Sequence, residues 1–268
     1  MSVPSVGILG LGFLGNTLMR NLDWGADSWG ASRRPPEDEP LLPCLRWDWG
    51  DPETWEALPA HAGALILTVP PVSRSIQTEQ ERLNTWGAWM RKHRPQHSRL
   101  VYVSTTGVYP RKNGSWSEAS EFVPDNDSGA LRLMTEQQLS SWFALQVVRP
   151  GGIYGPGRNL VERLLSGRGI PESNSPTHRI HVHDLAKAVR LLVLNPGIRC
   201  LNAVDQEACA SWDAAQWLVH HHPQLHPGML PERQVTQSAM QAPQRRIENA
   251  LLTQHLALRY PTFREGML

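Results

Sequence analysis

The sequence predicts an α/β fold, a parallel sheet with helices on both faces, and three observations support this. Residues 6–9 form a short apolar run that leads into a glycine-rich segment and then into leucines at helical spacing. Residues 64–69 and 100–104 are nearly continuous apolar runs, as is typical of strands covered on both faces. A helical pattern lies between these two runs. We therefore expect a Rossmann-type doubly wound parallel sheet with a small C-terminal substrate lobe.

Length and composition narrow the class of protein. At 268 residues and 40% hydrophobic content, the chain can form one large domain, or one domain with a small lobe. A net charge of +1 makes nucleic acid an unexpected partner. No run approaches the ~18 apolar residues of a membrane span, so we expect no membrane partner and a cytoplasmic location. Three cysteines without C-x-x-C spacing predict neither a disulfide framework nor a zinc site.

The first strand, expected over residues 6–9, leads into the pattern G-x-G-x-x-G at Gly10, Gly12 and Gly15. Gly10 would allow the tight turn, Gly12 would admit a pyrophosphate, and Gly15 would let the helix pack on the strand. Phe13 and Leu14 would then contact the phosphates from the first helical turn. The sequence therefore predicts a dinucleotide-binding turn. The alternative is a glycine turn that binds nothing.

The second strand, expected over residues 29–32, ends at the position that selects between NAD and NADP. An acid there would bond the ribose 2′-hydroxyl of NAD, but this chain has Ser32, Arg33 and Arg34. Two guanidinium groups can hold a 2′-phosphate, and a serine hydroxyl can add a hydrogen bond. NADP is therefore the expected cofactor, and NAD the second choice. The alternative is a pair of solvated arginines.

A third strand is expected over residues 45–49, followed by a helix start at Asp51-Pro52-Glu53. Asp48 could accept a hydrogen bond from the adenine amino group. The alternative is that Asp48 is a loop acid that caps the next helix. Both interpretations stay open from the sequence alone.

The fourth strand, expected over residues 64–69, ends at Thr68, Val69 and Pro70, where a doubly wound sheet faces its cofactor. The helix after it carries an apolar stripe that we expect to lie in the core, formed by Ile76, Leu83, Trp86 and Met90. A fifth strand is expected over residues 100–104, and we expect Ser104 at its end to contact the cofactor.

Three motifs resemble one family. They are Val-Tyr-Val-Ser-Thr-Thr-Gly-Val-Tyr at 101–109, Val-Arg-Pro-Gly-Gly-Ile-Tyr-Gly-Pro-Gly-Arg at 148–158, and Arg-Ile-His-Val-His-Asp-Leu-Ala at 179–186. The C-terminal segment 259–266 is similar to the usual ending of the same family. Together with the glycine turn, they resemble the extended short-chain dehydrogenase/reductase family, also called the NAD-dependent epimerase/dehydratase family. The likeness spans nearly the whole chain.

The resemblance implies roles for several residues. Thr105 would polarise the substrate oxygen, and Tyr109 is a candidate proton donor, with Tyr154 or water as alternatives. Gly152 stands where the family often has an asparagine, and we expect it to contact the cofactor. The family's Tyr-x-x-x-Lys pair falls on Ser128 and Arg132, and no tyrosine in the chain has a lysine four residues later. We expect Arg132 to hold the cofactor ribose.

The resemblance also predicts the domain organisation. A dinucleotide-binding domain would cover residues 1–154, and the part from 155 to 268 would complete the sheet over about 181–222 and form a small lobe. The lobe would comprise roughly 155–180 and 225–268, and between these two segments a strand of the sheet over 200–204 and a helix from Trp212 are expected. It is reduced, because only about 20 residues separate Arg158 from Arg179. The histidines at 220–222 and 226 are expected to be solvated, so no metal site is predicted.

Three functions remain at this point. The first is an atypical NADP-dependent oxidoreductase or epimerase that acts on a small hydroxyl or carbonyl compound. The second is a non-catalytic NADP-binding sensor or interaction protein, which the missing Tyr-x-x-x-Lys pair favours. The third, a hydroxyacid-type dehydrogenase, is disfavoured by the Tyr-Gly-Pro motif at 154–156. A small molecule and a second copy of the chain, forming a homodimer, are the expected partners.

Overall fold

The computed structural model describes residues 3–36, 41–170, 174–232 and 242–268. The chain divides into two compact units. The first comprises Met1–Pro110, Phe122–Arg149 and Ala186–Leu201, and the second comprises Arg111–Glu121, Pro150–Leu185 and Asn202–Leu268. Both units are discontinuous along the sequence. The single domain boundary expected after residue 154 stays a prediction, because packing units need not fold independently.

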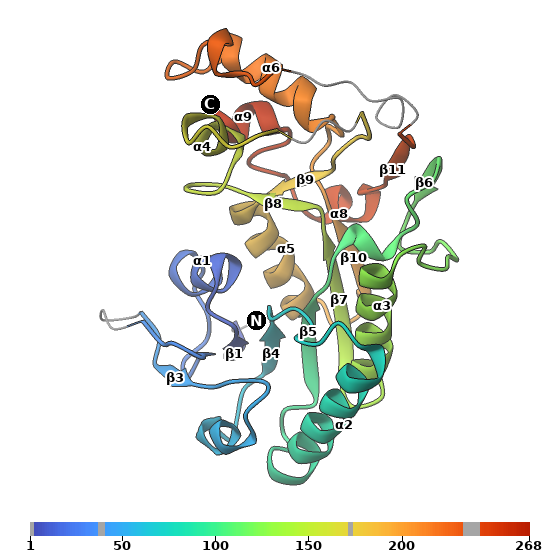
Figure 1. Cartoon of the computed structure of the whole chain (residues 1–268). Helices are drawn as coiled ribbons and strands as arrows, with labels where there is room; N and C mark the ends of the chain where they lie inside the picture. Colours follow the sequence, from blue (N-terminus) through green and yellow to red (C-terminus); the bar gives the residue numbers. More distant parts are fainter. Residues whose placement is uncertain (1–2, 37–40, 171–173, 233–241) are drawn as a thin grey trace. The chain divides into compact units, whose positions relative to one another are not determined.

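A seven-stranded sheet has the order β10-β7-β5-β4-β1-β2-β3 (Figure 1). The strand pairs from β7 through β3 are parallel. The strands are β1 (Val6–Leu9), β2 (Trp29–Ser32), β3 (Cys44–Arg46), β4 (Ala64–Leu67), β5 (Arg99–Val103), β7 (Ala144–Pro150) and β10 (Cys200–Ala203). β1 and β4, at the middle of this order, are buried along their whole length. The Rossmann-type sheet predicted from the sequence is confirmed.

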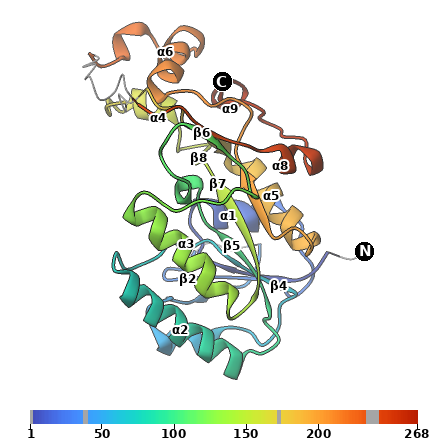
Figure 2. The same cartoon turned by 90° about the vertical axis from the view of Figure 1, so that its right-hand side faces the viewer.

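Helices cover both faces of this sheet. α2 (Ile76–His93) and α3 (Asp127–Ser140) run side by side on one face, and α1 (Phe13–Asn21) and α5 (Val182–Leu194) lie on the other (Figures 1 and 2). The faces follow from the alternation of side chains along β7. Gln146 donates a hydrogen bond to the Leu192 carbonyl of α5, whereas Arg149, three residues later, binds Glu136 of α3.

Two predictions about elements need correction. β3 ends at Arg46 rather than at residue 49, because the Asp48 carboxylate accepts a hydrogen bond from the Gly50 N–H at 2.9 Å and turns the chain there. Leu83, Trp86 and Met90 are buried as expected, but Ile76 is 43% exposed. Ile76 is the first residue of α2, before the helix reaches the core.

The second unit contains two small parallel strand pairs and several short helices. β6 (Gly114–Trp116) pairs with β11 (Arg245–Ile247), and β8 (Gly152–Tyr154) pairs with β9 (Arg179–His181). Its helices are α4 (Leu160–Leu165), α6 (Ser211–His221), α8 (Ala250–His255) and α9 (Phe263–Met267), with the 3-10 turn η3 (Pro227–Met229). A separate hydrophobic core joins α4, α6 and α9. In the described part of the chain, no helix has the length and apolar composition needed to cross a membrane.

Gly15 fixes how closely α1 packs on β1. A Cβ atom built on Gly15 would lie 1.9 Å from the Gly10 carbonyl oxygen, whereas one on Gly12 would meet no atom within 4 Å. Gly15→Ala should therefore destabilise the protein by about 3 kcal/mol, since the clash is with backbone. The matched control Gly12→Ala should cost less than about 1 kcal/mol. Urea unfolding measures both, and equal losses would contradict this account.

Candidate functional site

A cavity of about 900 Å³ lies in the first unit, at the carboxyl ends of β1, β2 and β4. Strand ends of this kind are where doubly wound sheets bind their ligands. The structure brings nine of the residues predicted to bind the cofactor to this cavity. They are Gly10, Gly12, Ser32, Arg33, Arg34, Asp48, Thr68, Val69 and Pro70.

The glycine turn is built by hydrogen bonds on both sides. Gly10 has a φ of +104°, which a glycine adopts without strain. Its N–H donates to the Ala31 carbonyl at 2.8 Å, and its own carbonyl accepts from the Thr68 hydroxyl at 2.7 Å. The Asn16 side-chain amide donates to the Leu11 carbonyl at 2.9 Å. The turn is therefore fixed by β2, β4 and α1 together.

The N-terminus of α1 faces this cavity without a cap. Gly12 is the N-cap residue, no side chain caps the helix there, and the first turn contains no acid. A Cβ on Gly12 would point into open space. Phe13 and Leu14 form the first helical turn, so this helix end offers N–H groups and a partial positive charge to an anion. The geometry fits the pyrophosphate of a dinucleotide.

The end of β2 supplies a second anion-binding group of residues. The Ser32 hydroxyl oxygen is buried and has no hydrogen-bond partner among the described residues. Arg33 and Arg34 are exposed, line the same cavity, and form no salt bridge with the described part of the chain. An unsatisfied buried hydroxyl costs free energy, and a ligand oxygen would remove that cost. A phosphate group is the ligand that suits all three side chains.

The far wall of the cavity contains residues that the sequence did not single out. Trp47 and Trp49 are fully buried, and their rings stack at 6.4 Å. Asp48, between them, lines the cavity, but its carboxylate also accepts the Gly50 N–H. This bond uses one carboxylate oxygen of Asp48 for a contact within the loop that follows β3. In the sequence, the two tryptophans that flank Asp48 just after β3 could have indicated that this segment is buried beside the cavity.

The loop after β4 is held by a buried carboxylate. Glu79, on α2, is fully buried and pairs with Arg82. Its Oε2 accepts the N–H groups of Val72 at 3.3 Å and Ser73 at 3.0 Å. These bonds fix the chain just after Val69 and Pro70. Glu79 is therefore a positioning residue for this wall.

The end of β5 is held by a second buried network. Ser104 donates to a Glu136 oxygen at 2.5 Å, and Arg149 contacts the same carboxylate at 2.6 Å. Arg149 also donates to the Tyr109 hydroxyl at 2.9 Å. This network weighs against two predictions, which stay predictions: the contact of Ser104 with the cofactor and the role of Tyr109 as a proton donor. The Ser104 hydroxyl is committed to Glu136 and does not line the cavity, and Tyr109 is 0% exposed, which argues against its role as a proton donor.

Thr105 and Arg132 lie beside that network. Thr105 is half-buried, and its hydroxyl oxygen accepts the Gly107 N–H at 3.0 Å, which starts the short 3-10 turn η2 (Thr106–Val108). Arg132 donates to the Tyr102 hydroxyl at 2.8 Å and does not line the cavity. Burial raises the pKa of Tyr102 to about 12, so this phenol stays protonated. Arg132 holds β5 in this structure, and its contact with a ribose stays a prediction.

The remaining predicted residues lie in the second unit. Gly152 donates its N–H to the His178 carbonyl at 2.8 Å, and its contact with the cofactor stays a prediction. Tyr154 is 4% exposed and donates to the Thr262 carbonyl at 3.2 Å. Burial raises the pKa of Tyr154 far above its ordinary value, which makes it a poor proton donor. The described residues include no group of three or more metal-ligating side chains.

Comparisons with known proteins identify the fold. No protein-family model and no curated protein matches the sequence. A candidate NAD-dependent epimerase/dehydratase from Methylobacillus flagellatus has a TM-score of 0.76 and 24% identity, over 99% of this chain and 97% of its own. A conserved protein of unknown function from Silicibacter pomeroyi DSS has a TM-score of 0.75 and 25% identity, over 99% and 97%.

A third structure was solved with a cofactor. The dTDP-glucose 4,6-dehydratase of Bacillus anthracis, in complex with NAD, has a TM-score of 0.74 and 13% identity, over 98% of this chain and 94% of its own. Identities this low establish the fold and do not transfer an activity. The resemblance carried by the sequence motifs is confirmed at the level of the fold, which this chain shares with structures of NAD-dependent epimerase/dehydratase proteins.

Proposed function

We propose that the first unit binds NADP(H) in the cavity at the ends of β1, β2 and β4. One observation carries this proposal. A single cavity combines an uncapped helix N-terminus at Gly12 with the buried hydroxyl of Ser32 and the guanidinium groups of Arg33 and Arg34. Among the described residues, this hydroxyl has no hydrogen-bond partner and these guanidinium groups form no salt bridge. The helix end suits the pyrophosphate, and the second group suits the adenosine 2′-phosphate. The NAD complex of a protein with this fold supports a nicotinamide dinucleotide.

The first candidate for what the bound dinucleotide does is oxidation, reduction or epimerisation of a small hydroxyl or carbonyl compound. Thr105 supports it, because this half-buried hydroxyl follows β5. The proton would have to come from water. The hydroxyls of Tyr102 and Tyr109 bind arginines in the interior, and that of Tyr154 donates to a backbone carbonyl.

The second candidate is a non-catalytic NADP-binding sensor or interaction protein. At the positions of the family's tyrosine and lysine, Ser128 is exposed near the start of α3 and Arg132 is bonded to Tyr102. A serine hydroxyl is too weak an acid to replace a phenol without a strong base beside it. The geometry therefore supports NADP binding with slow or absent turnover better than it supports a conventional epimerase.

The arginines generate a prediction about cofactor choice. NADPH should bind at least about tenfold more tightly than NADH, because a charge-assisted phosphate contact contributes about 1.5 to 3 kcal/mol. Arg33→Ala should remove most of that preference and leave NADH binding nearly unchanged. Arg20→Ala, at an exposed arginine near the end of α1, is the matched control. Cofactor fluorescence titrations of the wild type and the two variants, each with NADPH and NADH, measure these affinities.

Gly12→Val supplies an independent arm of the same test. The valine methyls would fill the space that a pyrophosphate needs, so this variant should fold and lose binding of both cofactors. Circular dichroism reports the fold, and thermal shift with NADPH reports binding. Equal affinity of the wild type for NADPH and NADH would overturn the NADP assignment. A normal NADPH-induced shift in Gly12→Val would overturn the site itself.

The missing pair generates a prediction about turnover. With NADPH and a panel of carbonyl compounds, the wild type should turn over below about 1 per second, under the usual enzyme range of about 1 to 1,000. Combining Ser128→Tyr with Arg132→Lys should raise the rate, because it restores a phenol beside an ammonium group. Arg132→Lys alone is the control for the lost Tyr102 contact.

Wild-type turnover within the usual range would contradict the non-catalytic candidate. Thr105→Val, Tyr109→Phe and Tyr154→Phe would then locate the groups that act on the substrate. Tyr109 and Tyr154 are buried and bonded, so their variants should lower the melting temperature more than Thr105→Val, which loses only its bond to the Gly107 N–H. The threonine variant should lower the rate constant most.

A further inference from the structure

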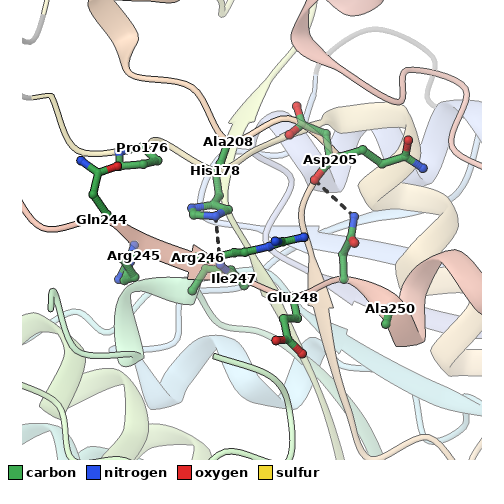
Figure 3. Close-up of a pocket in the computed structure, with 12 residues that line it drawn as sticks. Pro176, His178, Asp205, Ala208, Gln244, Arg245, Arg246, Ile247, Glu248 and Ala250 are labelled. Carbon is green, nitrogen blue, oxygen red and sulfur yellow. Dashed lines mark hydrogen bonds between the residues drawn. The ribbon is translucent and has the colours of Figure 1, made fainter. Parts of the chain in front are cut away.

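The second unit contains a cavity of about 680 Å³ that has no part in the proposed dinucleotide site. It is lined by residues from the loop after β10, from the segment before β9, and from β11 (Figure 3). Four of its residues carry the argument: His178, Asp205, Arg245 and Arg246. Two of these have buried polar atoms without a partner among the described residues, and the other two bring positive charge.

Asp205 contributes an unsatisfied carboxyl group. The residue is 4% exposed, and neither carboxyl oxygen forms a hydrogen bond of good geometry with the described residues. Its backbone carbonyl is engaged, because the Asn249 amide donates to it at 3.2 Å. Burial raises the pKa of Asp205 to about 7, although the Arg179 guanidinium and nearby backbone N–H groups oppose this rise. A ligand hydroxyl that donates to Asp205 would satisfy this group.

His178 contributes a buried hydrogen-bond donor, and the atom that donates is fixed by a second hydrogen bond to the ring. Its Nε2 accepts the Ile247 N–H at 2.9 Å (Figure 3), so the ring proton of the neutral imidazole lies on Nδ1. Nδ1 is buried without a partner in the described part of the chain. Burial lowers the pKa of His178 to about 4, helped by the charges of Arg245, Arg179 and Arg246. The imidazole is therefore neutral near pH 7 and offers one N–H to an acceptor.

Arg246 contributes an available charge. It lies on β11, is exposed, and forms no salt bridge or side-chain hydrogen bond with the described residues. Arg245 lines the same cavity and adds to the positive charge. The carboxylate of Glu248, also in the lining, accepts from the Ser115 hydroxyl at 2.6 Å. A guanidinium group without a carboxylate partner is suited to bind a carboxylate or phosphate of a ligand.

We propose that this cavity binds a small organic anion that carries several hydroxyl groups. The anionic group binds Arg246, one ligand hydroxyl donates to Asp205, and a ligand oxygen accepts from His178 Nδ1. A plain anion would leave Asp205 unsatisfied, and a neutral polyol would leave Arg246 unpaired. A divalent cation is unsuited, because the lining offers one unpartnered carboxyl and two guanidinium groups. The proposal does not depend on the dinucleotide site.

Calorimetric titration of the full chain tests the proposal with named probes. D-gluconate and D-glucose 6-phosphate carry the anion as a carboxylate or as a phosphate ester. D-glucose, acetate and inorganic phosphate each lack one of the two features. At least one polyhydroxylated anion should bind at least about tenfold more tightly than all three controls. The same result is expected in Gly12→Val, so failure here is distinguishable from failure of the dinucleotide proposal.

Variants locate the binding. Arg246→Gln should lower the affinity for the bound probe about tenfold, which corresponds to the loss of one charge-assisted contact. The matched control is Arg168→Gln, at an exposed arginine of the same unit outside the cavity, and it should have no effect. Asp205→Asn should also weaken binding, with circular dichroism to verify the fold. Absence of saturable binding, equal affinity for D-glucose, or equal effects of Arg246→Gln and Arg168→Gln would overturn the proposal.

Discussion

The site of the first unit depends on the contact between Gly15 and the carbonyl of Gly10. Only a residue without a Cβ fits there, and the contact sets the distance between the start of α1 and the end of β1. The uncapped helix end is thereby brought to the same cavity as the end of β2. The helix N–H groups at Gly12 and the side chains of Ser32, Arg33 and Arg34 therefore meet at one cavity, where we propose that they bind one ligand. In this proposal, backbone packing creates the anion site, and the side chains select the anion.

Two buried carboxylates hold the rest of the first unit's strand ends. The Glu79 carboxylate fixes the loop after β4 by accepting hydrogen bonds from the backbone N–H groups of that loop. The Glu136 carboxylate joins Ser104 to Arg149 at the end of β5. Removing one partner of such a buried pair typically costs about 3 to 5 kcal/mol. These carboxylates serve positioning, and they commit Ser104 and Tyr109 to the interior. As a consequence, the Tyr109 phenol near the end of β5 is not accessible to a substrate.

The sequence predicted local features well and tertiary networks poorly. β1 and β2 have the predicted bounds, and the glycine turn and Ser32-Arg33-Arg34 come together as expected, because strand periodicity and turn chemistry are local. The interior positions of Ser104 and Tyr109 depend on Glu136 and Arg149, which are distant in sequence. The sequence gives no sign that Asp205 and His178 are candidate ligand-binding residues. Only their burial without a hydrogen-bond partner among the described residues indicates this.

The central claim is that the end of β2 holds the 2′-phosphate of NADP(H), and phosphorus NMR of the bound cofactor tests it most directly. The second pKa of a phosphate monoester is about 6 in solution, and neighbouring guanidinium groups favour its dianion. We predict that the 2′-phosphate resonance of bound NADPH titrates well below pH 6 in the wild type, and nearer to the free value in Arg33→Ala. A bound 2′-phosphate that titrates as it does in free NADPH would contradict the account.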